Sequence, residues 1–127
     1  MGYQSQVQSL IYGPADQVWA LYTAEKLRGN EALVGWFAGC IKHWVNPGDS
    51  GFIQLNITHV KWYSEYPEVE AWEVLLEEAA KRGLCTEFVR VGEGADNDIE
   101  SRYTGDDVEY LLQVSRVIVC NLEVPDN

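Results

Sequence analysis

The chain is poor in basic residues and in histidine, and each shortage excludes a class of function. Nine lysines and arginines stand against 20 acidic residues, which gives a formal net charge of −11 at pH 7. A surface of that sign repels nucleic acid, so we expect no direct nucleic-acid binding. The two histidines, His43 and His59, belong to no recognisable nucleophile or metalloenzyme motif. We therefore expect no catalytic residues and no enzymatic activity.

Cysteine is also scarce, and long apolar runs are missing. Cys40, Cys85 and Cys120 are odd in number, far apart and in apolar or strand-like sequence, which predicts buried free thiols. Their spacing fits no metal site, and we expect no cofactor. No apolar stretch approaches the roughly 18 residues that span a bilayer, and no signal-peptide pattern is seen. These absences predict a soluble cytoplasmic protein without membrane association.

What the chain does contain is enough apolar sequence for one folded domain. Its 127 residues are 46% hydrophobic and include five tryptophans. This length is typical of one domain with its own core, so we expect residues 1–127 to form a single domain.

The hydrophobic pattern predicts an α+β fold, with two principal helices on one face of a mainly antiparallel sheet. We expect strands at 3–12, 52–60, 85–91 and 108–122, helices at 14–28 and 67–82, a turn at 46–49 and an acidic loop at 92–107. Residues 30–45 fit a short helix followed by a strand as well as one helix, because glycines interrupt an apolar run. The helix over 67–82 has the strongest signals, since Pro67 suits its first turn and Gly83 its end.

The negative charge is confined to the second half of the chain. Residues 1–64 contain four acidic and four basic residues, whereas residues 65–127 contain 16 acidic and five basic residues and carry the whole net charge of −11. Within residues 65–109 the net charge is −10. An asymmetry of this kind produces a field of one sign over part of the surface and attracts basic partners.

The acidic side chains of this half are the candidate binding site. Glu70, Glu73 and Glu77 recur at steps of three and four, so they share one helix face. The full candidate set is Glu68, Glu70, Glu73, Glu77, Glu78, Glu93, Asp96, Asp98, Glu100, Asp106, Asp107 and Glu109. Such crowding costs folding free energy through self-repulsion, so a partner explains it more readily than folding does. The competing interpretation is that the acids only keep the protein soluble.

Imitation of duplex DNA is the sharper interpretation of this surface. DNA-binding proteins recognise regularly spaced phosphates, and carboxylates on a rigid surface can occupy the same Lys/Arg-lined channel. Aromatic residues near the acids in sequence could anchor such an interface or serve the core: Trp62, Tyr63, Tyr66 and Tyr103. A two-fold homodimer would lengthen the charged surface to suit duplex DNA.

Residues 96–107 resemble part of a calcium-binding loop. Asp96, Asp98 and Glu100 place oxygen ligands at its first, third and fifth positions. Ser101 stands where the loop requires glycine, and Asp107 replaces the usual glutamate at the twelfth position. A metal-dependent enzyme centred on Asp96 is therefore a further hypothesis, and no metal site enters our preferred prediction.

Three short segments together resemble a family of small acidic phage proteins, most of them uncharacterised. The segments are Met-Gly-Tyr-Gln-Ser-Gln-Val at 1–7, Lys-Trp-Tyr at 61–63 followed by Tyr-Pro-Glu-Val at 66–69, and Arg-Val-Gly-Glu at 90–93 before an acidic loop. Gln4 and Gln6 stand where that family has charged residues. The resemblance implies no activity, but it implies a phage protein acting in the host bacterial cytoplasm, where small acidic proteins disable host enzymes.

Together, these observations predict a phage-encoded inhibitor that binds the basic DNA-binding surface of a host protein by mimicking the charge of duplex DNA. DNA gyrase is the first candidate target. The alternative is a structural or accessory phage protein whose acidity serves solubility.

Overall fold

The computed structural model describes residues 5–27, 41–46, 49–60, 62, 66–92, 99–114 and 118–120, and these form two layers around one sheet. The elements are β1 (Ser5–Pro14), α1 (Ala15–Leu27), β2 (Ile41–Asn46), β3 (Ser50–Val60), α3 (Pro67–Lys81), β4 (Cys85–Gly92), β5 (Ile99–Thr104), β6 (Leu112–Val114) and β7 (Ile118–Cys120). Five strands form a sheet in the order β2-β3-β1-β4-β5, and β6 pairs with β7. Every pairing is antiparallel.

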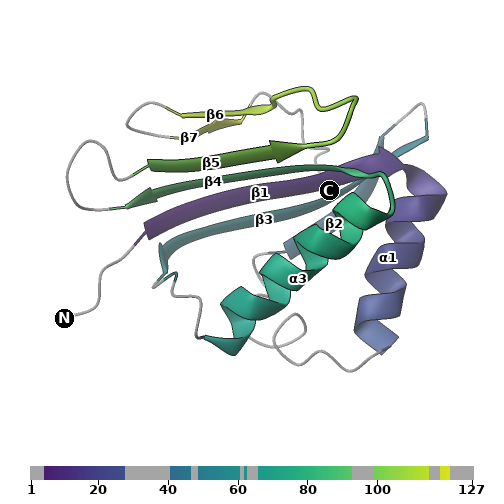
Figure 1. The fold of residues 1–127 in the computed structure, drawn as a ribbon, viewed down its shortest axis with the longest axis horizontal. Coiled ribbons are helices and arrows are strands. Elements are labelled where there is room, and N and C mark those ends of the chain that lie inside the picture. The colour runs from purple at the N-terminus through teal and green to yellow at the C-terminus, as the bar shows by residue number, and fades with distance from the viewer. Residues whose placement is uncertain are drawn as a thin grey trace.

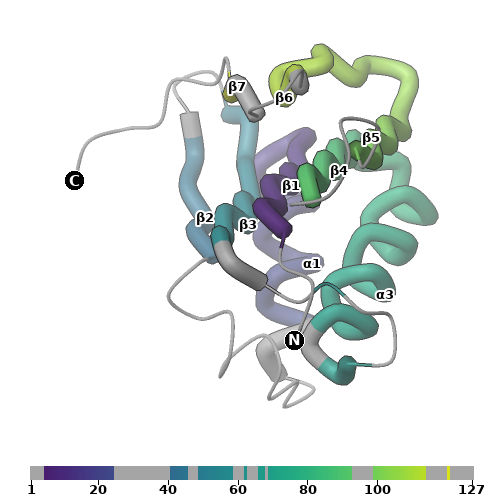
Figure 2. Tube along the Cα trace, turned by 90° about the vertical axis from the view of Figure 1, so that its left-hand side faces the viewer, coloured from purple at the N-terminus to yellow at the C-terminus, as the bar shows by residue number. Residues whose placement is uncertain are grey.

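The two helices α1 and α3 lie on one face of the sheet (Figure 1), and the β6-β7 pair lies over the other face (Figure 2). This arrangement confirms the predicted α+β fold with two principal helices on one face. None of the described helices combines the length and the apolar character that crossing a membrane would require.

Alternation along the strands divides the buried side chains between the two faces. The helix-side core consists of Val7, Ile11, Val18, Leu21, Ile53, Leu55, Trp72, Leu75, Leu76, Ala79, Leu84 and Phe88. The opposite face buries Leu10, Tyr12, Phe52, Cys85, Val89 and Leu112. The strands of the sheet centre are thus buried on both faces, although only one face is covered by helices.

Helix α3 follows the sequence prediction closely. Its apolar stripe, Val69, Trp72, Leu76 and Ala79, is buried. Gly83 follows the C-cap residue with a φ of 78°, and the Leu84 amide donates a hydrogen bond to the Ala79 carbonyl oxygen. This closure satisfies carbonyls at the helix end and turns the chain directly into β4.

Helix α1 also agrees with the prediction, except at its start. Pro14 pairs with Ser50 as the last residue of β1, so the helix begins at Ala15 and not at Pro14. The Ala15 amide donates to the Asp49 carbonyl oxygen over 2.8 Å, which ties the start of α1 to the turn before β3. At this turn both strands are two residues longer than predicted. β1 ends at Pro14 and not at residue 12, and β3 begins at Ser50 and not at residue 52.

The structure corrects two predictions in the second half of the chain. Residues 99–104 are a strand, β5, and not part of an acidic loop. Residues 108–122 do not form one long strand, because residues 108–111 are not in a strand and the short β6 and β7 follow. In the ambiguous region, residues 41–46 form the edge strand β2, and the part before it lies outside the described residues.

The cysteine prediction holds for Cys85, which is buried and free. Cys120 is also free but only half-buried, and Cys40 lies outside the described residues.

Candidate functional site

The acidic residues of the second half lie on both sides of the edge strand β5. Figure 2 shows α3 and the segment from β5 to β6 on the same side of the molecule, with β5 between them and β2 at the opposite edge of the sheet. Glu70 and Glu77 are exposed on α3, and Asp106, Asp107 and Glu109 are exposed on the segment. We call these five side chains the acidic flank of β5.

The other candidate residues stand apart from this flank. Glu73, Glu78 and Glu100 are half-buried. Glu68 lies in the first turn of α3, but its side chain is outside what the structure describes. Glu93, Asp96 and Asp98 lie outside the described residues.

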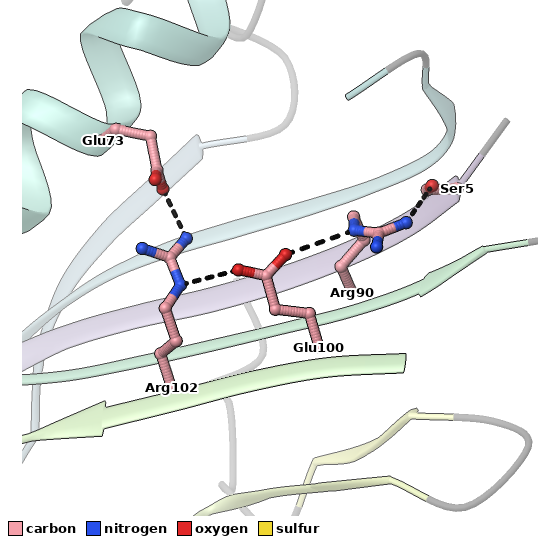
Figure 3. Close-up of polar contacts among 5 residues, drawn as sticks. All are labelled: Ser5, Glu73, Arg90, Glu100 and Arg102. Atoms are coloured by element: carbon pink, nitrogen blue, oxygen red, sulfur yellow. Dashed lines mark hydrogen bonds and ion pairs between the residues drawn. The ribbon is translucent and has the colours of Figure 1, made fainter. Parts of the chain in front are cut away.

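A ladder of polar contacts runs from α3 across β5 and β4 to β1 (Figure 3). The Arg102 guanidinium pairs with Glu73 over 2.6 Å and with Glu100 over 3.0 Å. Glu100 also pairs with Arg90 over 3.4 Å, and Arg90 donates a hydrogen bond to the Ser5 hydroxyl over 3.2 Å. The register explains the ladder, because Arg90 and Glu100 are cross-strand partners on the helix side of the sheet.

Arg102 also covers part of the core. Its guanidinium carbon lies 4.2 Å from the centre of the Phe88 ring, a distance typical of a cation–π contact. The side chain of Arg102 is 43% exposed, so each of its ion pairs contributes about 0–1 kcal/mol. The ladder joins α3 to the β5 edge by several such contacts.

Glu73 and Glu100 are already ion-paired within the ladder, so their carboxylates are not available to a partner. Glu78 is likewise engaged, since it pairs with Arg82 one helical turn away over 3.3 Å. In the part of the chain that the structure describes, none of the five residues of the acidic flank forms an ion pair. Their charge is therefore not neutralised locally.

The exposed face of α3 also contains an apolar residue, Val74, that is not part of the predicted site. Val74 is 46% exposed and lies between Glu70 and Glu77 on the helix. Those two glutamates are seven residues apart, which is about 10.5 Å along the helix axis. The sequence could have indicated this position, because Val74 follows Glu70 by four residues and therefore lies on the same helix face.

Tyr110, next to Glu109 in the chain, is a second exposed hydrophobic residue. It is 54% exposed, and its backbone has a φ of 52°. The centres of the Tyr110 and Tyr103 rings are 4.8 Å apart. Tyr103 and Trp62 serve the packing instead, because Trp62 lies against Phe88 and Tyr103 donates a hydrogen bond to the Leu112 carbonyl oxygen. Tyr103 was predicted as a candidate anchor, whereas the residue exposed at this position of the surface is Tyr110.

A buried carboxylate holds the segment between β5 and β6 in place. Glu87 on β4 is fully buried on the face opposite the helices. It accepts hydrogen bonds from the amides of Leu111 and Leu112 over 3.1 and 2.8 Å, and from the Tyr12 hydroxyl. The Tyr12 hydroxyl in turn accepts a hydrogen bond from the Glu109 amide over 2.7 Å. We call these contacts the Glu87 clamp.

The Glu87 clamp shifts the acid–base properties of its neighbours. Burial raises the pKa of Tyr12 far above its ordinary value, and the nearby Glu87 carboxylate raises it further, although the hydrogen bond from the Glu109 amide opposes the shift. Burial also raises the pKa of the Cys85 thiol, against a hydrogen bond from the Asp107 amide, and the negative charges of Asp107, Glu109 and Glu87 add to that rise.

Residues 99–104 do not form the second part of a calcium-binding loop, and Asp96 and Asp98 of the expected loop lie outside the described residues. Half of the expected loop forms β5, which pairs with β4 along its length and cannot wrap an ion. The Glu100 carboxylate, one of the expected ligands, contacts Arg90 and Arg102 instead. Across the described ranges, no three His, Cys, Asp or Glu side chains gather in a way that could hold a metal ion.

Comparison with known proteins adds no relative. No protein-family model matches the chain, and neither a curated protein nor a solved structure does so.

Proposed function

We propose that the protein is an inhibitor that uses the acidic flank of β5 to occupy the Lys/Arg-rich DNA-binding surface of a bacterial DNA-handling enzyme. The observation that supports the proposal is the set of five exposed carboxylates that form no ion pair in the described part of the chain. They come from two segments on either side of one strand, so the charge extends over a surface and not along a single helix.

The chemistry of DNA recognition explains why such a surface could compete with DNA. Lysine and arginine side chains that bind phosphates release counterions, and this term dominates affinity for DNA. Carboxylates on α3 and on the segment between β5 and β6 offer the same side chains fixed negative charges. Val74 and Tyr110 add exposed apolar area beside the carboxylates, which would give the complex contacts that salt does not screen.

The resemblance to small acidic phage proteins directs the choice of target. In a phage setting, the partner would be a host enzyme in the bacterial cytoplasm, and DNA gyrase is the first to test. The protein would then bind no nucleic acid itself, because the acidic flank repels phosphate.

The test is a supercoiling assay with purified gyrase at rising concentrations of the protein and of DNA. We expect inhibition that added DNA relieves and that weakens as the salt concentration rises, because charge-led association is screened. The variant Glu70→Gln/Glu77→Gln should inhibit about tenfold less well, and Asp106→Asn/Asp107→Asn should behave similarly, since each removes two charges from a surface that steers association.

The matched control is Asp16→Asn/Asp49→Asn, which removes two exposed charges from the neutral half of the chain. This control should inhibit like the wild type. Inhibition that is equally strong in all three variants, or that is indifferent to salt, would contradict the proposal. If gyrase is unaffected, capture from bacterial lysate with the wild type and Glu70→Gln/Glu77→Gln would seek another DNA-binding target. A failure to capture any charge-dependent partner would favour an accessory protein that its acids keep soluble.

A further inference from the structure

One segment on the face of the sheet opposite the helices is attached to the strands through side chains. Residues 105–111 connect β5 to β6 and form no strand. The amides of Glu109 and Leu111, and that of Leu112 directly after the segment, donate hydrogen bonds of 2.7 to 3.1 Å to side chains of the Glu87 clamp. We call residues 105–111 the strap. Its polar attachment to the sheet is separate from the backbone ladders that join β1, β3, β4 and β5.

The start and the middle of the strap both have backbone conformations that favour glycine. Gly105 has a φ of 108°, and Tyr110 has a φ of 52°. Glycine adopts such angles freely, but at Tyr110 the backbone is strained, because a Cβ crowds it there. Strain of this kind persists only where surrounding contacts fix the chain. The clamp provides these contacts, since it holds the amides on both sides of Tyr110, those of Glu109 and Leu111.

Negative charge on both sides of the clamp also opposes closure of the strap. Glu87 is fully buried and, among the described residues, forms no ion pair. The strap carries Asp106, Asp107 and Glu109, which are all exposed. Burial raises the pKa of the Cys85 thiol, and the charges of Asp107, Glu109 and Glu87 raise it further, so these carboxylates lie near one another. They repel across the contact, and added salt should weaken this repulsion because it screens charge.

The strap also covers the thiol of Cys85 on β4. This residue is 6% exposed, and the Asp107 amide donates a hydrogen bond to its sulfur. Gly105 lies against the same residue, since a Cβ at position 105 would come within 2.8 Å of the Cys85 Sγ atom. Cys85 is therefore a native reporter of the strap, because a thiol reagent can reach its sulfur only after the strap has moved.

We propose that the strap opens and closes as a unit on a sheet that stays folded, with Gly105 as its hinge. Opening would release the strain at Tyr110 and separate the carboxylates, and both effects offset part of the cost of breaking the clamp. It would also change the placement of Asp106, Asp107 and Glu109 relative to α3, and these are three of the five carboxylates of the acidic flank. The inference does not depend on the proposed inhibition, because the strap of a protein that leaves gyrase unaffected can still open.

Alkylation of Cys85 in the wild-type protein, located by peptide mass spectrometry, tests this opening. The rate is measured relative to that of the fully unfolded protein, at rising urea concentrations below the transition in which the whole protein unfolds. We expect Cys85 to react through an opening whose urea dependence is much weaker than that of global unfolding, because only the strap exposes new surface. A urea dependence equal to that of global unfolding would overturn the inference.

Charge variants separate the strap from the rest of the acidic flank. Rising salt should slow the labelling of Cys85 in the wild type. Asp106→Asn/Asp107→Asn should slow it about threefold and weaken its dependence on salt, because two of the repelling charges are removed. The matched control is Glu70→Gln/Glu77→Gln, which removes two flank charges from α3 on the other face of the sheet and should leave labelling unchanged (Figure 1). Equal slowing in both variants would contradict a force that acts at the strap.

Hydrogen exchange follows the same opening without a chemical label. The amides of Glu109, Leu111 and Leu112 should exchange with one common opening free energy, below that of the amides that join β1 to β4. Protection of these three amides equal to that of β1 and β4 would overturn the inference. So would labelling of Cys85 that is accompanied by loss of protection in β4, since the sheet itself would then be opening.

Discussion

The two edges of the five-stranded sheet, β5 and β2, differ in the side chains that surround them. At β5, Glu100 and Arg102 form a ladder with α3 and β4, and the acidic flank surrounds the strand with uncompensated negative charge. At β2, aromatic rings pack against the strand, and Trp19 and Val45 remain half exposed. A charged edge of the kind seen at β5 discourages the addition of a further strand. The comparison shows that charged side chains of α3, β4 and β5 form a network at one edge, whereas β2 at the other edge carries one charged residue, the exposed Lys42, among aromatic side chains.

The largest expected effect comes from breaking the Glu87 clamp, which holds the acidic segment beside β5. Glu87→Ala would leave the amides of Leu111 and Leu112 and the Tyr12 hydroxyl without their buried acceptor. We expect the free energy of unfolding to fall by about 3 kcal/mol or more, measured by urea denaturation. The exposed Glu109→Ala is the matched control in the same segment and should change stability little, since it leaves the clamp's backbone donors in place. Equal effects of the two variants would contradict the role given to Glu87.

A second prediction concerns the dependence of stability on alkaline pH, through the hydroxyl of Tyr12 in the Glu87 clamp. The pKa of Tyr12 is raised in the folded protein, so between the ordinary tyrosine pKa of about 10 and the higher folded value the unfolded chain loses the proton first. Stability from this group is complete below pH ~10 and is lost as pH rises above it, by up to about 1.4 kcal/mol per pH unit.

Urea denaturation at several alkaline pH values measures this slope. Tyr12→Phe should be less stable at neutral pH, because it loses two hydrogen bonds, but its stability should decline less steeply above pH ~10. A variant with the same slope as the wild type would show that another group titrates in that range.

The smallest expected effect concerns the ladder at β5. Arg102→Gln would remove two ion pairs and the contact with Phe88, and we expect it to lower the free energy of unfolding by about 1 kcal/mol. The control Arg82→Gln removes a single pair with Glu78 at the C-terminal end of α3 and should cost only about 0.3–0.5 kcal/mol. High salt should shrink both effects, and a larger loss in Arg82→Gln would reverse the order expected from the structure.

Much of the fold could be predicted from the sequence where local chemistry decides the structure. Pro67 and Gly83 bound α3, and its apolar stripe indicates the buried face, because both signals lie within the helix itself. The acidic half could also be located by counting charges. The strand β5 was not predicted because its charged residues are typical of a solvated loop. In the structure Glu100 and Arg102 of this strand form an ion pair with each other.

Other features depend on contacts between residues far apart in the chain. The non-strand course of residues 108–111 follows from Glu87, whose partner Leu112 lies 25 positions later. The exposure of Trp19 and Val45 depends on the order of strands in the sheet, which places β2 at an edge. No local pattern reports that order, so the difference between the two edges could not be foreseen.

The Glu87 clamp also has a consequence for the order in which the chain folds. Its hydrogen bonds join residues that are up to 97 positions apart, as between Glu109 and Tyr12. The acceptor and the hydroxyl come together only when β1 and β4 have paired, so we expect the segment before β6 to dock on a sheet that already exists. Closing such long loops is slow, and the chain would complete its acidic side last. The mutual repulsion of those carboxylates would then act on a formed core and not on the collapsing chain.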